Sequence, residues 1–282
     1  MSSSTQNQIL LSARFSVSYA GKATVLRDVQ LEIQRGEVLG LVGQSGSGKS
    51  TLAMAILGLL DKRARAAGAI KFQNSEPPRF DLLQLSEREL RSVRGRVIGL
   101  VLQSPLSALN PALKIRTQLK EAWRAHAATT NADCANAIRS SLESVSLAPD
   151  DDFLRKYPSQ MSVGQAQRVL IAMAVMHRPA LLIADEATSA LDVITQAEIL
   201  ALFRQLNRST GMSILYISHD LASVADICDR IAILHRGEIV ECGATAQIFS
   251  NPQHEYTRRL MAAMPRTLRV SAQAATGAAA AR

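Results

Sequence analysis

Near the N-terminus, apolar and polar residues alternate in short stretches between residues 10 and 42. Phe15–Tyr19 and Val29–Ile33 follow a period of two, which is typical of strands with one buried face. Residues 38–42 are nearly all apolar, as expected for a strand that is buried on both faces. A glycine-rich loop comes next, and the apolar positions from Ser50 to Leu60 then predict a helix.

The rest of the chain alternates predicted helices with predicted strands. Residues 104–177 are mostly helical in pattern, and they are expected to form a helical subdomain. Beyond them, apolar runs predict strands at Leu181–Ala184, Ser213–Ser218 and Arg230–Leu234, and a helix over Ile199–Leu206. Strands that alternate with helices favour an α/β fold with a mainly parallel central sheet. The end of the chain is Ala-rich, which predicts a loosely ordered tail.

The composition is that of a globular protein, because 47% of the 282 residues are hydrophobic. The formal net charge is +8, yet no run of Lys and Arg reaches five and only 4% of residues are aromatic. Proteins that bind single-stranded nucleic acids use aromatic side chains as stacking platforms. We therefore interpret the charge as a diffusely basic surface and expect no nucleic-acid partner.

Cysteines and apolar segments narrow the expected location. Cys134, Cys228 and Cys242 are far apart and form no C-x-x-C pair, so neither a disulfide framework nor a zinc site is expected. The first residues lack the pattern of a secretory signal, and no segment approaches the 18 or more apolar residues of a membrane span. The sequence favours a cytoplasmic protein, with any membrane spans supplied by other chains.

One stretch matches the phosphate-loop pattern G-x-x-x-x-G-K-[ST] at every fixed position. A buried strand precedes it and a helix follows it, which is the context that this motif needs. Its glycines let backbone N–H groups surround phosphate oxygens, its lysine adds a full charge, and its last serine offers a hydroxyl to Mg²⁺. The candidate nucleotide contacts are Gly43, Ser45, Gly46, Gly48, Lys49, Ser50 and Thr51.

Two carboxylates follow the predicted strand Leu181–Ala184. Asp185 is expected to hold the Mg²⁺ shell together with Ser50, and Glu186 is placed to polarise the attacking water as a general base. Alone, this pair would be an ordinary polar strand end. Beside a phosphate loop, it predicts a nucleoside triphosphatase that uses Mg²⁺.

These residues resemble the nucleotide-binding subunit of an ATP-binding-cassette transporter, and the resemblance runs from about residue 10 to 265. It implies a P-loop NTPase core with a mainly parallel sheet, an N-terminal antiparallel β subdomain and a helical signature subdomain. The cassette domain is expected over 8–265, with the helical part at about 104–177 and a tail over 266–282.

Four single residues acquire roles through this resemblance. Tyr19 stands where the family places an aromatic side chain that stacks on adenine, and Gln103 where a glutamine reaches Mg²⁺ and the attacking water. Asp192 lies in Ser189–Asp192, which resembles the loop that crosses the family's dimer interface. His219 follows a predicted strand and matches the switch histidine that contacts the γ-phosphate.

The stretch QMSVGQAQR, residues 160–168, is a helix start by its own pattern. Ser162 and Gln165 form an S-x-x-Q capping box, in which each side chain satisfies a free N–H at a helix start. It stands before the Asp185 strand, where the family has its signature L-S-G-G-Q, and it resembles that signature. In the family, the signature contacts the γ-phosphate bound by a partner subunit. Ser162, Gly164 and Gln165 match that signature, whereas Val163 replaces a glycine.

Two further stretches narrow the resemblance to importers. Residues 103–111 and Asn251–Thr257 are similar to stretches of the dipeptide, oligopeptide and nickel importer ATPases. Many of those relatives continue into a cysteine-containing tail, but no Cys follows Cys242 here, so a metal cluster in the tail is in doubt. Ala187 also replaces the proline that usually follows the two carboxylates.

The resemblance implies an ATPase subunit that powers import of a small solute, peptide-like or a nickel complex. Its expected partners are a second ATPase subunit, identical or homologous, two membrane permease subunits and an extracytoplasmic solute-binding protein. Its expected place is peripheral, on the cytoplasmic face of the inner or plasma membrane. Two alternatives remain open: a non-transport cassette ATPase, and a weakly catalytic regulatory half of a heterodimer. The transported solute and the identity of the second ATPase are also left open.

Overall fold

The computed structural model describes residues 9–20, 24–73, 79–127 and 130–263. The chain divides into two compact units, the first formed by residues up to Leu90 together with those from Ser213 on, and the second by Arg91–Met212. The predicted tail over 266–282 lies outside the described residues. None of the described helices combines the length and apolar character that a membrane crossing needs.

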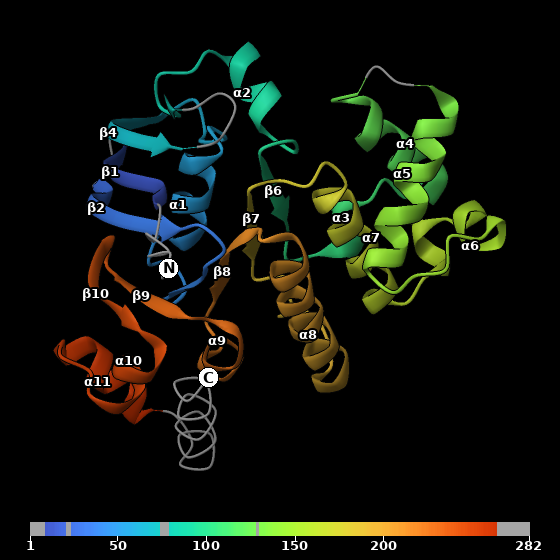
Figure 1. Ribbon diagram of the computed structural model, residues 1–282. Coiled ribbons are helices and arrows are strands. Elements are labelled where there is room, and N and C mark those ends of the chain that lie inside the picture. Colours follow the sequence, from blue (N-terminus) through green and yellow to red (C-terminus); the bar gives the residue numbers. More distant parts are fainter. Residues whose placement is uncertain (1–8, 21–23, 74–78, 128–129, 264–282) are drawn as a thin grey trace, which may run out of the picture. The chain divides into compact units, whose positions relative to one another are not determined.

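The first unit contains an antiparallel sheet with the strand order β2-β1-β4-β5. The long strands β1, β2 and β4 lie side by side in it (Figure 1). Within β2, alternate residues from Val29 to Ile33 are buried, as the period of two predicted. The expected N-terminal antiparallel β subdomain is therefore confirmed. Its strands are β1 (Ile9–Tyr19), β2 (Thr24–Gln34), β4 (Ala64–Phe72) and β5 (Phe80–Asp81).

A second set of strands in this unit runs in the order β10-β9-β3-β8. Strand β3 pairs in parallel with β8 and with β9, while β9 and β10 form an antiparallel hairpin. Every residue of β3 is buried, which confirms the expectation from its continuous apolar run. The strands are β3 (Val38–Val42), β8 (Ser213–Ser218), β9 (Arg230–His235) and β10 (Glu238–Ala244).

The helices of the first unit follow strands closely. Helix α1 comes directly after β3 and its loop, and it ends at Ile56 because the chain reaches Gly58 in a left-handed conformation, with φ +62°. The helix predicted up to Leu60 is therefore shorter than expected. The bounds are α1 (Lys49–Ile56), α9 (Leu221–Ile227), α10 (Thr245–Ser250) and α11 (Glu255–Ala262), and α2 (Glu87–Val93) leads into the second unit.

The second unit pairs two parallel strands with a largely helical segment. Strands β6 and β7 run parallel, and β7 is buried throughout. Helix α8 is longer than the predicted Ile199–Leu206 because an aspartate caps it earlier in the chain. The bounds are β6 (Ile98–Val101), β7 (Leu181–Asp185), α3 (Pro105–Ala108), α4 (Ile115–Arg124), α5 (Asn131–Ser144), α6 (Asp151–Arg155), η1 (Pro158–Gln160), α7 (Val163–Val175) and α8 (Val193–Thr210).

Candidate active site

The predicted phosphate loop joins β3 to α1, and its backbone needs glycine at three positions. Gly46 and Gly48 have φ angles of +77° and +110°, in the left-handed region that side chains disfavour. A Cβ on Gly43 would lie 2.3 Å from the carbonyl oxygen of Leu234. The glycines therefore allow both the sharp turn and the close approach of a neighbouring strand.

Lys49 is the first residue of α1 and lies folded against the loop. Its side chain is 95% buried, and Nζ donates hydrogen bonds to the carbonyl oxygens of Gly43 at 2.8 Å and Gln44 at 3.2 Å. A buried ammonium needs such oxygen partners because its desolvation is costly. The contacts hold a full positive charge at the loop.

The N-terminus of α1 lacks a capping side chain. Gly48 caps the helix without any side-chain hydrogen bond, and no acidic residue occupies the first turn. The first N–H groups of a helix lack internal partners and attract anions. The hydroxyl of Ser47 is also buried without a hydrogen-bond partner among the described residues. The loop thus offers backbone and hydroxyl donors that fit a phosphate group.

A turn far along the chain contacts the phosphate loop, although no local sequence pattern links the two segments. Gly237 joins β9 to β10, and its N–H donates to the carbonyl oxygen of Ser47 at 3.1 Å. Its own carbonyl oxygen accepts from the N–H of Arg27 at 2.8 Å. A Cβ at Gly237 would lie 2.1 Å from the carbonyl oxygen of Val25. The glycine at 237 was the only local sequence signal of a turn there.

His219 belongs to the same edge of the sheet as the loop. Val42 and Ser218 are register partners in the parallel strands β3 and β8, so Gly43 and His219 leave neighbouring strands at their carboxyl ends. His219 is exposed, and Asp220 after it caps α9 by accepting from the N–H groups of Ala222 and Ser223. The carboxyl edge of parallel strands is where open α/β folds bind ligands.

Tyr19 is the last residue of β1 and is half-buried. Residues 21–23 follow it outside the described part of the chain, and no described ring contact involves Tyr19. Its stacking role stays a prediction.

Asp185 and Glu186 end strand β7 in the second unit. Asp185 is 92% buried, whereas Glu186 is half-buried. Glu186 has a φ angle of +49°, which is unusual for a residue with a side chain. Strain of this kind persists where the surrounding structure fixes a side chain for function, and here it affects the residue predicted to act as the base.

Gln103 lies at the edge where these carboxylates lie. Val101 of β6 and Ala184 of β7 are register partners in parallel strands, and the two chains leave the sheet just beyond them. Gln103 is exposed between the end of β6 and the start of α3. The structure therefore brings Gln103, Asp185 and Glu186 to one strand edge, and their catalytic roles stay predictions.

The capping box predicted at the start of α7 is confirmed. The hydroxyl of Ser162 accepts a hydrogen bond from the N–H of Gln165 at 3.1 Å, and the side-chain oxygen of Gln165 accepts one from the N–H of Ser162 at 3.2 Å. Gly164 lies close to α8, because a Cβ there would meet Cγ2 of Thr195 at 2.8 Å. The signature residues therefore lie beside the first turn of α8.

Asp192 is the cap of α8 and not only a loop residue. Its carboxylate accepts from the N–H groups of Ile194 at 3.1 Å and Thr195 at 3.0 Å, and from the Thr195 hydroxyl at 2.7 Å. The bonds from Thr195 hold the pKa of Asp192 below its ordinary value. An aspartate three residues before a threonine at a helix start was the available sequence signal.

The candidate residues thus form two groups, each within one unit. The phosphate loop, Tyr19 and His219 belong to the first unit, and Gln103, Asp185, Glu186, Asp192 and the signature residues belong to the second. Among the described residues, no three His, Cys, Asp or Glu side chains gather closely enough to hold a metal ion by themselves. Magnesium suits such a donor set, since it is usually held by one or two carboxylates and substrate phosphates.

Comparisons with known proteins place these features in a family. The sequence pattern of the family described as ABC transporter matches residues 26–189. A peptidoglycan transport ATP-binding protein of Agrobacterium fabrum is 44% identical, over 93% of this chain and 48% of its own length. A dipeptide transport ATP-binding protein of Bacillus subtilis is 39% identical, over 88% of this chain and 73% of its own length.

Solved structures agree with the sequence comparisons. A dimeric bacterial ABC transporter cassette has a TM-score of 0.70 at 27% identity, covering 84% of this chain and 98% of that one. A dimeric post-hydrolysis cassette bound to ADP and Pi has a TM-score of 0.69 at 26% identity with the same coverage. The chain spans about half the length of the Agrobacterium relative. The predicted fold class is confirmed by these likenesses.

Proposed function

The chain belongs to the ABC transporter family, and on that premise we propose that it is an ATPase subunit that powers solute import. The phosphate loop is the observation that carries this proposal. Its left-handed glycines, the buried Lys49 and the uncapped start of α1 together suit a nucleoside triphosphate.

Each candidate residue then has a defined task. Lys49 and the first N–H groups of α1 bind and orient the phosphates, and Tyr19 stacks on the adenine. Magnesium, when bound, would neutralise phosphate charge, and Ser50, Gln103 and Asp185 are the residues that would hold it. Glu186 accepts a proton from the attacking water, while His219 holds the γ-phosphate.

The signature residues serve a second ATPase subunit in this proposal. Ser162 and Gly164 approach the phosphate bound by the partner, and Asp192 lies on the segment between the two ATPase subunits. Next to Asp192, the side chains of Val193 and Ile194 are 82% and 75% exposed. Large apolar side chains this exposed mark a surface that another protein covers, so the second subunit is expected to cover them.

Import of a small, peptide-like solute is the transport reaction that we propose, because the relatives are named for peptidoglycan and dipeptide transport. A nickel complex is the second solute class. The chain works at the cytoplasmic face of the membrane with two permease subunits and an extracytoplasmic solute-binding protein. Val163 supports one alternative role, a weakly catalytic half of a heterodimer, since it departs from the signature at an exposed position.

The ATPase part of the proposal is tested with purified protein. We expect magnesium-dependent release of phosphate from ATP, and loss of binding of a fluorescent ATP analogue in Lys49→Ala. One charge-assisted contact contributes about 1.5–3 kcal/mol. Lys62→Ala, at an exposed position of the same unit, is the matched control and should bind normally. Equal affinity in both variants contradicts the assignment of the phosphate loop.

The transport part needs a different experiment. Tagged protein purified from detergent-solubilised membranes of its source organism should bring two polypeptides with membrane-spanning segments in fixed ratio. Their identification by mass spectrometry, followed by solute-stimulated ATPase activity of the assembled complex, supports import. Recovery with ribosomal proteins instead supports the non-transport alternative.

A further inference from the structure

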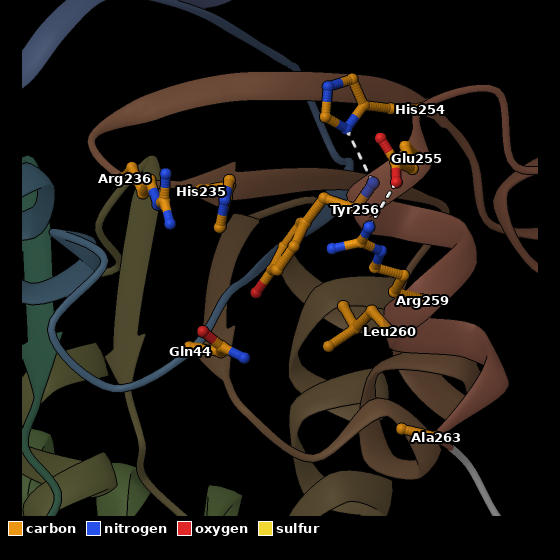
Figure 2. Close-up of a pocket in the computed structure, with 9 residues that line it drawn as sticks. All are labelled: Gln44, His235, Arg236, His254, Glu255, Tyr256, Arg259, Leu260 and Ala263. Atoms are coloured by element: carbon orange, nitrogen blue, oxygen red, sulfur yellow. Dashed lines mark hydrogen bonds and ion pairs between the residues drawn. The ribbon is translucent and has the colours of Figure 1, made fainter.

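A cavity of about 370 Å³ opens beside the phosphate loop, in a part of the first unit to which the proposed ATPase gives no task. Its walls come from the β9–β10 turn, from α11 and the residues that flank it, and from Gln44 of the loop (Figure 2). Cavities of this size hold small organic ligands. The side chains that line it include several hydrogen-bond donors and two arginines.

The residues that line the cavity include two arginines and one glutamate. Glu255 is the only acidic side chain among the lining residues, and Arg259 one turn later on α11 already forms an ion pair with it. Arg236 lines the same cavity and is exposed. Its guanidinium has no hydrogen-bond or ion-pair partner among the residues that the structure describes. Among the lining residues, Arg236 is therefore the cation without an acidic partner, and its guanidinium offers several N–H donors.

The backbone holds Arg236 in a conformation that its side chain disfavours. Arg236 and Gly237 form the two-residue loop between β9 and β10, and their φ angles are +50° and +86°. Both central residues of such a turn favour Gly, Asn or Asp. An arginine there is a backbone outlier, and an outlier beside a cavity points to a use for its side chain.

Two aromatic rings form a fixed wall next to Arg236. The rings of His235 and Tyr256 stack with centroids 3.7 Å apart and an angle of 22°. His254 fixes the backbone at Tyr256 by capping α11, because Nδ1 of His254 accepts the backbone N–H of Tyr256 at 3.1 Å. A neutral His254 then carries its proton on Nε2, as a further donor. The wall is held by contacts that need no occupant.

The hydroxyl of Tyr256 is available to donate a hydrogen bond. Its oxygen is buried and has no hydrogen-bond partner among the described residues. Figure 2 shows it directed toward the side chain of Gln44, which is exposed and belongs to the phosphate loop. An occupant that displaces the Gln44 side chain gives this hydroxyl an acceptor.

We propose that this cavity binds a small organic anion through a carboxylate or phosphate group, with Arg236 as the principal charge and the Tyr256 hydroxyl as a second donor. Both groups share the chemistry that a guanidinium recognises, since each offers two oxygens to its fork of N–H donors. Occupancy displaces Gln44 and so alters the phosphate loop. This last step rests on the proposed ATPase, whereas the binding does not.

The pKa of His235 reports on the charges around the cavity. Burial lowers the pKa of His235, and the neighbouring Arg236 and His254 lower it further, while Glu238 raises it. An anion between these groups reverses the second effect, so its binding should raise the pKa of His235. The imidazole is thus a built-in reporter of occupancy that proton NMR can follow.

Calorimetric titration of the full chain with malonate and, separately, with inorganic phosphate tests the binding. We expect a dissociation constant at or below about 1 mM for at least one probe. Arg236→Gln should weaken it at least tenfold, because one charge-assisted contact is lost. Tyr256→Phe keeps the stacked ring and should weaken it several-fold. Arg258→Gln is the matched control, since Arg258 lies on α11 outside the cavity and donates to the carbonyl oxygen of Gln253 at 2.8 Å.

Lys49→Ala distinguishes binding of the probes in the cavity from binding at the phosphate loop, which is itself a candidate anion site. Affinity that falls in Arg236→Gln and persists in Lys49→Ala supports the proposal, and which probe binds decides between carboxylate and phosphate. Affinity that falls only in Lys49→Ala, or no binding of either probe at about 10 mM, overturns it. Thermal unfolding of each variant verifies folding, and Tyr256→Phe alone decides if Arg236→Gln is unstable. None of these measurements requires ATP hydrolysis, so failure of the ATPase proposal is recognised separately.

Discussion

Ser162 and Gln165 satisfy each other across the first turn of α7, with reciprocal hydrogen bonds of 3.1 and 3.2 Å. Val163 lies between them as the first residue of the helix, and it does not belong to the residues with positive φ. Its backbone therefore does not need the glycine that the signature usually has. Any effect of Val163 on a partner's nucleotide must come from its side chain, which is 38% exposed.

Val163→Gly should consequently raise catalysis at the site that holds the partner's ATP, because it removes a side chain where phosphate and loop approach. We expect the helix to lose a few tenths of a kcal/mol, since glycine is a poorer helix former. The assay is ATP hydrolysis by the assembled complex, with the partner's catalytic glutamate intact or mutated. A gain that persists without that glutamate, or no gain at all, shows that Val163 is tolerated variation.

Glu186→Gln should retain ATP binding and lower turnover by about 10²–10⁴-fold, because an amide cannot accept the proton of the attacking water. The amide keeps the size of the side chain, so the left-handed backbone at this position is undisturbed. Steady-state phosphate release and binding of a fluorescent ATP analogue are measured on the same preparation. Hydrolysis above about a tenth of the parent rate shows that another group is the base.

Gln167→Met should stabilise the protein. Gln167 on α7 is completely buried, and neither its Nε2 nor its Oε1 has a hydrogen-bond partner among the described residues. A buried polar group left unpaired costs about 1–3 kcal/mol, and methionine fills a similar volume without that penalty. Thermal unfolding is the measurement, and Gln205→Met at an exposed position of α8 is the control. A lower melting temperature for Gln167→Met indicates that internal water satisfies the amide.

Asp192→Asn should alter how stability depends on pH. The bonds from Thr195 lower the pKa of Asp192 in the folded protein, so the ionised carboxylate stabilises α8. That contribution is present above the pKa of the unfolded chain, about 4, and is lost as pH falls through the lower folded value. The difference in melting temperature between parent and variant should shrink between about pH 6 and pH 3. A difference that is constant over this interval contradicts the role of the charge.

The phosphate loop could be predicted from the sequence because its chemistry fixes the spacing locally. Gly43, Gly48 and Lys49 must follow one another along the chain to surround a phosphate, and the buried run before them identifies the strand. The capping box of Ser162 and Gln165 is local in the same way. The parallel strands β3, β7 and β8 followed from their continuous apolar runs, whereas β6 was not predicted.

Other features depend on distant contacts and leave no local pattern. No sequence pattern near Ser47 predicts its hydrogen bond from the N–H of Gly237. Likewise, no pattern near Glu186 predicts its positive φ angle. The first turn of α8 was missed because Val193 and Ile194 are exposed, which breaks the apolar periodicity of a helix. Asp192 sets that helix start through hydrogen bonds that composition alone does not reveal.

The bond between Gly237 and Ser47 also sets an order of events during synthesis. The ribosome delivers the phosphate loop early, but the strand and turn that support it come near the end of the described chain. A nascent chain that stops before Arg230 has the nucleotide motif in its sequence and lacks the wall formed by Leu234 and Gly237. Nucleotide affinity should therefore arise late in translation, once the hairpin has left the exit tunnel.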